Sequence, residues 1–228
     1  MKKAIVVLSG GQDSATCAAW AKTMFDECLA ISFDYGQRHK RELESARGIA
    51  SMLEMQHFVL NMPALKDNPM SGLTNSKLSV NETDEKTGLP KSFVPGRNLL
   101  FLNTVASLAI SQGIYDIVTG VCQTDYSGYP DCRRTTIDAI ERSIFLGNEE
   151  LIKGRGPGYF HIHTPLMYLT KAESVTLAER LPRGLEAVAL SWTCYEGGEK
   201  PCGVCPACDL RIKGFAEAGI SDPALELF

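Results

Sequence analysis

One junction near the start of the chain constrains the fold more than any other feature. The run Lys3–Leu8 is apolar and rich in β-branched residues, so it predicts a buried strand. The strand stops at residues 9–14, which read Ser-Gly-Gly-Gln-Asp-Ser, and a helical pattern then continues from Ser14 to Met24. Two glycines let the backbone turn tightly, and the N–H groups at the helix start then point into the turn. The junction therefore predicts a binding site for an anion, most simply a phosphate.

A plain strand-to-helix turn is the competing interpretation, in which Asp13 or Ser14 merely caps the helix. Two glycines and two hydroxyls exceed what a cap needs, so we favour the phosphate site. The junction lacks the Gly-Lys-Ser/Thr of a Walker A loop, and the sequence contains no Gly-x-Gly-x-x-Gly for a dinucleotide. Nucleotide hydrolysis of the motor or switch kind is therefore disfavoured.

The rest of the chain continues the alternation of strands and helices. Further strands are predicted at Cys28–Phe33, His57–Met62, Tyr115–Val121 and Phe160–Leu166, and helices at Glu42–Leu53, Asn98–Ser111, Arg134–Leu146 and Lys171–Leu181. The pattern predicts an α/β fold with a doubly wound, mostly parallel five-stranded sheet. Residues 63–95 are polar and rich in turn formers, which predicts a long loop, whereas 154–158 are expected to form a plain turn.

Length and charge narrow the class of partner. A chain of 228 residues suits one domain with a small appendage. Its net charge of −4 is the reverse of the basic footprint of a nucleic-acid-binding protein, so we expect small-molecule substrates and no nucleic acid. The N-terminal apolar run is too short for a signal peptide or a membrane span. We therefore expect a cytoplasmic protein without a membrane partner.

The eight cysteines fall into two groups. Four are dispersed (Cys17, Cys28, Cys122 and Cys132), whereas four lie close together near the C-terminus (Cys194, Cys202, Cys205 and Cys208). Four thiolates with two-residue spacers suit one tetrahedral Zn²⁺, and four sulfurs leave no position for a water. The pattern predicts a structural zinc site in a small C-terminal ribbon; an iron–sulfur cluster and independent buried thiols are the alternatives. Nearby cations are few (Lys200, Arg211 and Lys213), so the segment offers only a thin basic patch.

The hexapeptide Ser-Gly-Gly-Gln-Asp-Ser resembles the signature of the PP-loop superfamily, whose members split ATP between the α and β phosphates and pass AMP to a substrate. The resemblance implies the adenine nucleotide alpha hydrolase fold, a PP-loop ATP-binding catalytic domain over residues 1–190 and a zinc-binding segment over 191–228. It assigns ATP binding to Leu8, Ser9, Gly10, Gly11, Gln12, Asp13 and Ser14, and catalytic roles to Asp13, Ser14 and Lys171. Asp13 would hold Mg²⁺ with the pyrophosphate. Lys171 would meet phosphate oxygens, although a solvated helix lysine is the alternative.

Three polar strings follow predicted strands or precede predicted helices, at Phe33–His39, Val94–Asn98 and Asp125–Arg133. Ligands of open α/β sheets bind outside the carboxyl ends of the strands, so these strings should surround the phosphate loop. Their side chains could stack on the ring of a ligand, hydrogen-bond its edge and hold an anionic group; the candidates are Arg97, Asp125, Tyr126, Tyr129, Asp131 and Arg133. Surface-turn or helix-cap roles are the alternative for each.

Together with the hexapeptide and the four cysteines, these strings resemble the 7-cyano-7-deazaguanine synthase family. The resemblance implies a ligase that converts 7-carboxy-7-deazaguanine, ammonia and ATP into the nitrile through an adenylated acid and an amide, in queuosine biosynthesis. It also implies Mg²⁺ with ATP, one structural Zn²⁺ and a homodimer. Two rivals stay open. One is another PP-loop adenylating enzyme, such as a tRNA-modifying thiolase or lysidine synthase; the other is a zinc-bearing protein that binds ATP only as a sensor.

Overall fold

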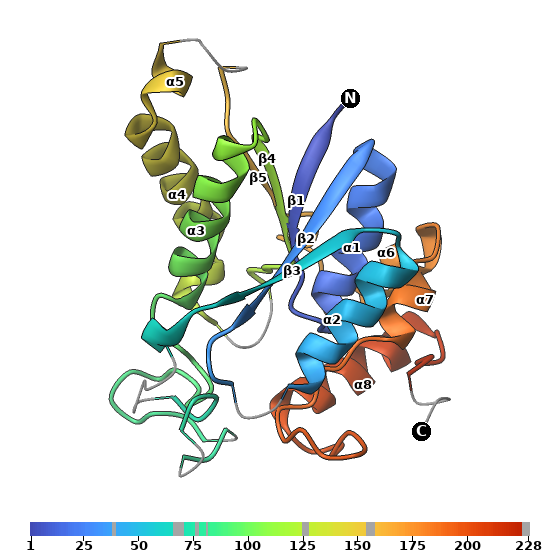
Figure 1. Cartoon of the computed structure of the whole chain (residues 1–228). Helices are drawn as coiled ribbons and strands as arrows, with labels where there is room; N and C mark the ends of the chain where they lie inside the picture. The colour runs from blue at the N-terminus through green and yellow to red at the C-terminus, as the bar shows by residue number, and fades with distance from the viewer. Residues whose placement is uncertain are drawn as a thin grey trace.

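The computed structural model describes residues 1–37, 40–65, 71–75, 78–80, 82–124, 128–153 and 158–224. Five strands form one sheet: β1 (Lys3–Val7), β2 (Glu27–Asp34), β3 (Gln56–Asn61), β4 (Asp116–Thr119) and β5 (His161–His163). All four pairings are parallel, and the order across the sheet is β3-β2-β1-β4-β5 (Figure 1). The predicted five-stranded parallel sheet is confirmed.

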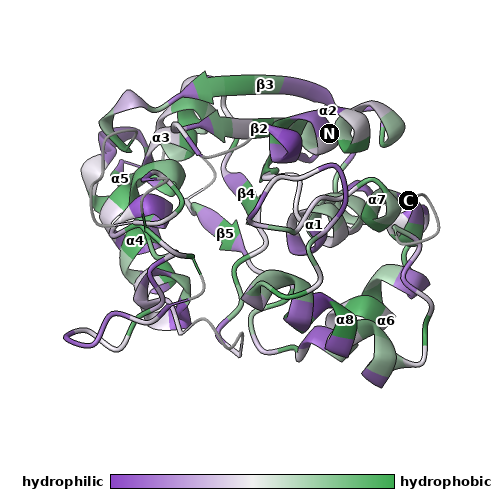
Figure 2. Ribbon diagram, turned by 90° about the horizontal axis from the view of Figure 1, so that it is seen from below, coloured by the Kyte–Doolittle hydropathy of each residue, from purple (hydrophilic) through white to green (hydrophobic). Residues whose placement is uncertain are grey.

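Helices cover both faces of the sheet. They are α1 (Gln12–Met24), α2 (Arg41–Met52), α3 (Arg97–Ser111), α4 (Arg134–Gly147), α5 (Glu149–Ile152), α6 (Lys171–Arg180), α7 (Gly184–Ala189) and α8 (Pro206–Ala218), with short 3₁₀ turns at Pro63–Leu65 and Pro130–Cys132. Seen from below, α3 and α4 lie on one side of the strands and α1, α6, α7 and α8 on the other (Figure 2). Sequence patterns did not predict α5, α7 or α8. Among the described residues, no helix has the length and apolarity that a bilayer span requires.

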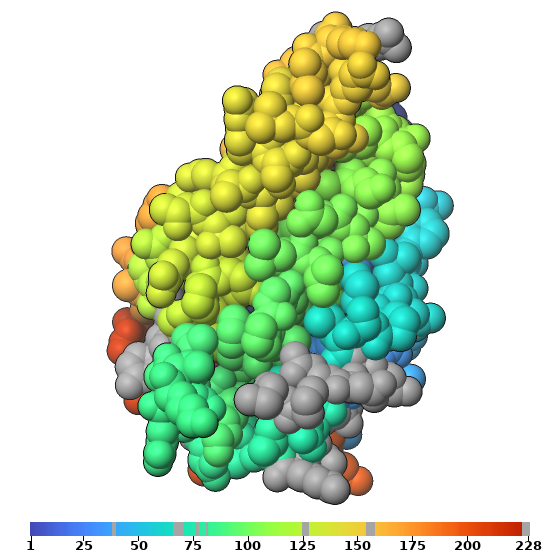
Figure 3. All heavy atoms as spheres, turned by 90° about the vertical axis from the view of Figure 1, so that its left-hand side faces the viewer, coloured from blue at the N-terminus to red at the C-terminus, as the bar shows by residue number. Residues whose placement is uncertain are grey.

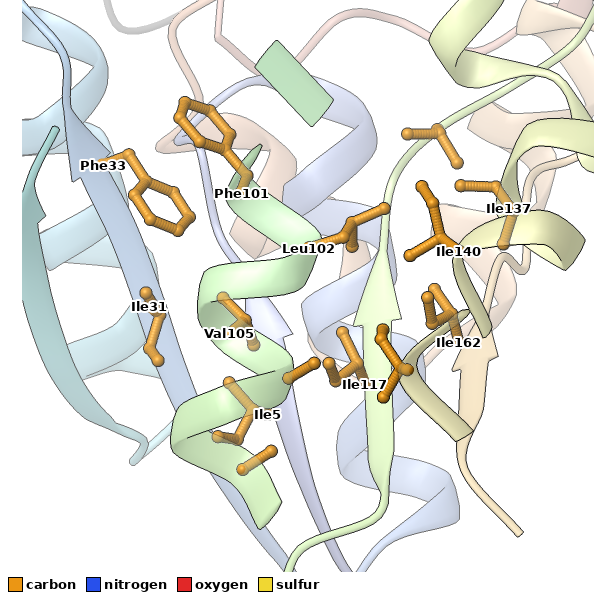
Figure 4. Close-up of a cluster of buried hydrophobic side chains, with 14 of the residues drawn as sticks. Ile5, Ile31, Phe33, Phe101, Leu102, Val105, Ile117, Ile137, Ile140 and Ile162 are labelled. Carbon is orange, nitrogen blue, oxygen red and sulfur yellow. The ribbon is translucent and has the colours of Figure 1, made fainter. Parts of the chain in front are cut away.

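Continuous apolar runs in the strands follow from burial on both faces. On one face, Ile5, Ile117 and Ile162 of the sheet pack against α3 and α4 (Figure 4). Phe33 of β2 stacks on Phe101 of α3, with ring centroids 3.9 Å apart. On the other face, a run of small residues in α1, including Ala15, Ala18 and Ala21, is fully buried and permits close approach to the sheet. With both faces covered, the loops at the strand ends are left to form a site.

The strand order places a switch point between β1 and β4. The chain goes from β1 outward to β2 and β3, and then returns to build β4 and β5 on the opposite side. Connections leave such a point in opposite directions, so a crevice forms outside the carboxyl ends of the two strands. Gly120, which follows β4, lies against the first turn of α1, because a Cβ there would be 3.0 Å from the backbone N of Ser14. The predicted phosphate loop therefore lies where this fold class binds ligands.

The segment between β3 and α3, which we predicted as a long loop, contributes to the core. Its side chains Leu65, Leu73, Val80 and Val94 are buried in the same cluster as Ile5. An antiparallel bridge also pairs Thr83 with Pro90. In Figure 3 the described part of this segment, in teal and green, lies against the lower end of α3. The described residues of the segment are therefore packed beside the strand ends.

Candidate active site and metal centre

The turn after β1 is fixed by close backbone contacts. Gly10 has φ of +92°, and a Cβ there would lie 2.0 Å from the carbonyl oxygen of Glu42 in α2. Any side chain at this position would be both strained and obstructed. On its other side, the Gly10 carbonyl accepts a hydrogen bond of 2.8 Å from the backbone N–H of Trp192. The turn is therefore held between α2 and the segment that leads to the cysteines.

Two serine hydroxyls organise the same turn. The Ser14 Oγ accepts from the backbone N–H of Gly10 at 3.1 Å and donates to the Gly11 carbonyl at 2.9 Å. The Ser9 Oγ donates to the Ser14 Oγ at 3.0 Å and accepts from the Gly11 N–H at 3.3 Å. The N-cap of α1 is Gly11, and no side chain makes a cap hydrogen bond there. Neither Asp13 nor Ser14 therefore makes the cap hydrogen bond that the alternative assigned to them.

Gln12 of the turn carries an unsatisfied donor. Its side chain is 4% exposed, and Nε2 has no hydrogen-bond partner among the described residues. Leaving a buried donor unpaired costs roughly 1–3 kcal/mol, so such groups are rare without a functional reason. An acceptor atom supplied by a ligand would remove this cost.

Asp13 and Lys171 form an ion pair across 158 residues of sequence. The Lys171 Nζ lies 2.7 Å from Oδ2 and 2.9 Å from Oδ1 of Asp13. A capping box between Thr170 and Glu173 starts α6, which sets Lys171 at its first position. The Lys171 side chain is only 13% exposed, so the interpretation as a solvated helix lysine is wrong. The pair lines a small pocket with Cys122 and Thr124.

A second charged cluster surrounds Arg97 at the start of α3. Arg97 Nη1 donates to the Tyr35 hydroxyl at 3.5 Å, and its guanidinium lies 5.9 Å from the Tyr35 ring centroid. Glu42 interacts with the same arginine; burial raises the pKa of the Glu42 carboxyl to about 7, opposed by the Arg97 charge. Sequence reasoning missed Glu42, because an acidic residue in a first helical turn is ordinary. Its backbone contact with Gly10 places this cluster next to the phosphate loop.

The other predicted substrate residues meet different surroundings. Tyr129 is buried, and its hydroxyl lies 2.7 Å from the Ser92 Oγ. Asp131 is 4% exposed, and its Oδ2 accepts from the backbone N–H of Asn98 at 3.1 Å, so part of its role is to cap α3. Both lie close enough to Arg97 to interact with its charge. Arg133 is exposed at the start of α4, whereas Asp125, Tyr126 and the glycine-rich stretch 154–157 lie outside the described residues.

The four C-terminal cysteines converge as predicted. The sulfurs of Cys194, Cys202, Cys205 and Cys208 all lie within 4.8 Å of one another, and those of Cys202 and Cys208 are 3.9 Å apart. Four sulfurs at 2.3 Å from one tetrahedral Zn²⁺ would be separated by about 3.8 Å. The backbone N–H of Cys202 donates to the Cys194 sulfur, and the backbone N–H of Cys205 donates to the Cys202 sulfur, both at 3.3 Å. The donor set fits one closed metal site, so the interpretation as independent thiols is wrong.

Local structure prepares this site for a cation. Hydrogen bonds, first from the Cys208 thiol and then from backbone N–H groups, hold the pKa of the Cys205 thiol below its ordinary value, which favours the thiolate form that a metal ligand requires. Gly203, with φ of +73°, makes the turn between Cys202 and Cys205. The indole N–H of Trp192 donates to the Cys194 carbonyl at 2.8 Å. The cysteine site and the phosphate loop therefore share Trp192 as a connecting residue.

The basic residues near the cysteines are largely engaged. Arg211 is buried and pairs with Asp222, with Nε to Oδ2 at 2.6 Å. Lys213 pairs with Asp209 at 2.7 Å on the surface of α8. Two of the three cations of the segment are thus neutralised by neighbours, which weakens the hypothesis of an RNA-binding surface there.

Comparison with known proteins decides the family. A sequence model for the family described as "Queuosine biosynthesis protein QueC" matches residues 3–219. The chain belongs to the QueC family. Relatives named 7-cyano-7-deazaguanine synthase are 51% identical over 223 residues in Laribacter hongkongensis (97% of this chain, 93% of the relative). One from Chromobacterium violaceum is 48% identical over 228 residues (99% and 94%), and one from Clostridium kluyveri 43% over 224 (98% and 97%). The predicted family is confirmed, and the chain is an enzyme of queuosine biosynthesis.

Solved structures agree on the fold alone. A predicted subunit of tRNA methyltransferase from Methanocaldococcus jannaschii superposes with a TM-score of 0.50 at 17% identity, covering 78% of the QueC-family chain and 75% of its own. A 4-thiouridine synthetase, solved as an RNA complex with bound ATP, gives a TM-score of 0.50 at 16% identity over 96% of this chain and 53% of its own. These matches support the PP-loop type of sheet.

Proposed function

We propose that this enzyme converts 7-carboxy-7-deazaguanine and ammonia into 7-cyano-7-deazaguanine, using ATP that is split into AMP and pyrophosphate. The observation that carries the proposal is the Asp13–Lys171 pair, which lies beside a turn built to receive phosphate in a chain of the QueC family. In this proposal the pair would supply one carboxylate and one ammonium where the α–β phosphate bond of ATP breaks. Adenylation needs charge stabilisation and positioning at that point more than it needs covalent chemistry.

The turn residues are assigned to the nucleotide. The first backbone N–H groups of α1, which begins at Gln12, and the Gln12 Nε2, which has no partner among the described residues, would donate to phosphate oxygens. Asp13 supplies carboxylate oxygens of the kind that Mg²⁺ prefers, and Lys171 opposes the charge that develops on the leaving pyrophosphate. Mg²⁺ bound with ATP would neutralise phosphate charge during the displacement. Both Asp13 oxygens face Lys171, so this lysine would have to shift or share the carboxylate when the metal–nucleotide complex enters.

Arg97 is the best-placed residue for the substrate carboxylate. Its guanidinium lies among Tyr35, Tyr129 and Asp131. This cluster is next to the phosphate loop, because Gly10 of that loop lies against the backbone of Glu42. A guanidinium matches a carboxylate in geometry and charge, whereas Tyr129 and Asp131 offer a ring face and an acceptor for an amino-pyrimidinone edge. Asp125, Tyr126 and Arg133 are retained as proposed contacts on the strength of the family resemblance. Four thiolates make a structural Zn²⁺ the proposed occupant of the cysteine site.

The reaction needs two activations at one carbon. A carboxylate oxygen attacks the α-phosphate of ATP and releases pyrophosphate; ammonia then attacks the acyl carbon, loses a proton, and displaces AMP with that oxygen. The amide oxygen next attacks the α-phosphate of a second ATP. Loss of AMP and of both N–H protons leaves the nitrile. Both carboxyl oxygens thus depart on AMP, and both steps are assigned to the one phosphate loop at Ser9–Ser14.

Product stoichiometry tests the proposal. The enzyme is incubated with ATP, ammonium and 7-carboxy-7-deazaguanine, and the nitrile, AMP, ADP and pyrophosphate are quantified by mass spectrometry and chromatography. We expect two AMP and two pyrophosphate per nitrile, and one AMP per nitrile when synthetic amide is supplied without ammonium. A ratio of one from the acid, or release of ADP, would contradict the double adenylation. AMP release that requires intact tRNA would favour a tRNA-modifying activity instead, and ATP binding without AMP release would favour a sensor.

The remaining features of the proposal concern the context of the enzyme. We propose a cytoplasmic homodimer without a nucleic-acid partner, with a catalytic domain at 1–190 and a metal-binding segment at 191–228. Light scattering after size-exclusion chromatography distinguishes one chain of 24.9 kDa from a pair. Expression of 1–190 alone tests the division, although Phe215 of α8 packs into the same core cluster as Leu8, so we expect the truncated chain to be less stable.

A further inference from the structure

Helix α8 presents a bare stretch of backbone to the proposed catalytic lysine. A Cβ built on Gly214 would lie 2.4 Å from Cγ and 3.0 Å from Cβ of Lys171, and 3.3 Å from its carbonyl carbon. All three of the nearest atoms belong to Lys171. Carbon atoms normally rest about 3.5–4.0 Å apart, so any side chain at position 214 would have to displace the lysine stem or separate α8 from α6. The glycine is therefore matched to one residue rather than to the helix surface in general.

Two independent anchors hold α8 in that place. The cysteine site fixes the N-terminal end of α8, because Cys205 is the N-cap of the helix and Cys208 lies in its first turn. Gly214 follows Cys208 by six residues, which is about 9 Å along a helix. Between them, Arg211 donates to both carboxylate oxygens of Asp222, at 2.6 and 2.8 Å, and to the Ser191 Oγ at 2.9 Å. A helix tied at its start and in its middle can act as a rigid support.

We propose that Gly214 is a positioning residue, through which the metal-bound helix α8 holds the Lys171 ammonium on Asp13. This inference rests on the proposed function, because it deepens the role given to Lys171. It also gives the cysteine site a task beyond folding: the metal fixes the start of the helix that sets the reach of the lysine. The Gly10–Trp192 hydrogen bond ties the same C-terminal segment to the phosphate loop from the other side.

The geometry explains why a small displacement would matter. Three bonds follow Cγ before the Lys171 Nζ, so a rotation that relieves contact at Cγ moves the ammonium by several times the displacement of the stem. The ammonium now lies within hydrogen-bond distance of both Asp13 oxygens, at 2.7 and 2.9 Å. Catalytic positioning is sensitive to shifts of about 1 Å, which can cost a hundredfold in rate. A methyl group at position 214 should thus reduce adenylation through Lys171.

The test compares Gly214→Ala with Gly48→Ala. Gly48 is also inside a helix, but a Cβ there would meet only Leu190 at an ordinary 3.9 Å. We expect Gly214→Ala to lower kcat/KM for AMP formation at least tenfold while it retains one zinc per chain, and Gly48→Ala to stay within twofold of the wild type. A Gly214→Ala enzyme with kcat/KM within twofold of the wild type would overturn the inference.

A double-mutant cycle separates positioning from general damage. Lys171→Ala removes Cγ, so in that background Gly214→Ala should cause no further loss of AMP formation. Its decrease of the unfolding midpoint should also be smaller than in the wild type, because the closest contact, at 2.4 Å, is removed and only Cβ at 3.0 Å and the carbonyl carbon at 3.3 Å remain. Equal decreases in both backgrounds would refute the assignment. If the wild type made no AMP, the proposed function would fail separately, and the smaller decrease of the midpoint in the Lys171→Ala background would still decide the contact.

Discussion

The phosphate loop and the cysteine site are both built from short motifs, yet they depend on the fold in different ways. All four cysteines lie between residues 194 and 208, so one loop and the first turn of α8 bring the sulfurs together. The pair at the phosphate loop joins Asp13 of α1 to Lys171 of α6, which are 158 residues apart in the sequence. A local chelating motif specifies its own geometry once a metal binds, whereas the ion pair requires β1, β4 and α6 to be placed first.

This contrast predicts different consequences of damage. Loss of a metal ligand should act on folding, because the free energy of metal binding becomes part of the free energy of folding. Loss of the loop carboxylate should act on chemistry, because the surrounding backbone is held by Gly10, Gly11 and the serine hydroxyls rather than by Asp13. Helix α8 contacts both regions. Variants of α8 therefore test whether damage to the cysteine site can change activity at the phosphate loop.

The largest expected effect comes from Cys205→Ser. Binding of a structural zinc is worth on the order of 10 kcal/mol, so losing one thiolate should lower the free energy of unfolding by several kcal/mol and reduce zinc content and soluble yield together. Residual folded enzyme should keep a substrate KM near normal. Elemental analysis and chemical denaturation measure these changes. Cys28→Ala, which removes a buried thiol far from the cluster in sequence, is the control and should keep its zinc. Active wild-type protein that contains no zinc would contradict the prediction.

Asp13→Asn should come next, with an effect confined to activity. We expect AMP formation to fall at least about a hundredfold, roughly 3 kcal/mol, because the amide cannot hold Mg²⁺ or balance Lys171. The protein should stay folded, as circular dichroism and thermal unfolding will show. Asp138→Asn is matched chemically, since Asp138 also pairs with a cation but at the exposed surface of α4. Near-normal turnover in folded Asp13→Asn would return this residue to a structural role.

The smallest expected effect concerns Glu42 and pH. Burial raises the pKa of its carboxyl from 4.5 to about 7 in the folded protein, so the folded state binds the proton more tightly than the unfolded state. This contribution to stability is fully present below pH 4.5 and disappears as pH rises through 7. Glu42→Gln should therefore gain stability over the wild type as pH rises from 5 to 8. We expect a gain of roughly 1–2 kcal/mol rather than the full value of the pKa shift, because Glu42 keeps some contact with solvent that weakens the effect.

Thermal unfolding of both proteins at pH 5, 6, 7 and 8, without ligands, measures this difference. Glu44→Gln is the control, because Glu44 is exposed in the same first turn of α2. An equal dependence on pH in wild type and Glu42→Gln would show that the carboxyl ionises in the folded protein as easily as in water. If Arg97 binds the substrate carboxylate beside Glu42, saturating substrate should also shift this dependence.

Sequence patterns were reliable where a signal is local. Apolar runs located all five strands to within a few residues, although β5 is only three residues long where seven were predicted, because the chain turns soon after His163. Patterns failed for α8, because the residues around the last cysteines were interpreted only as part of a small C-terminal ribbon. They also did not indicate any role for Glu42 or Gly214. An acid or a glycine in a helix acquires such a role only through a contact with a residue far along the chain.

By itself, the sequence determined the class of sheet, the turn after the first strand, the cluster of four cysteines and the family, because each depends on periodicity or on residues a few positions apart. Only the tertiary structure decided that Asp13 faces Lys171, that Gly120 lies against the first turn of α1, and that Gly214 leaves room for the lysine. The reason is physical: strand order and helix packing set which distant residues meet, and no local pattern encodes those meetings.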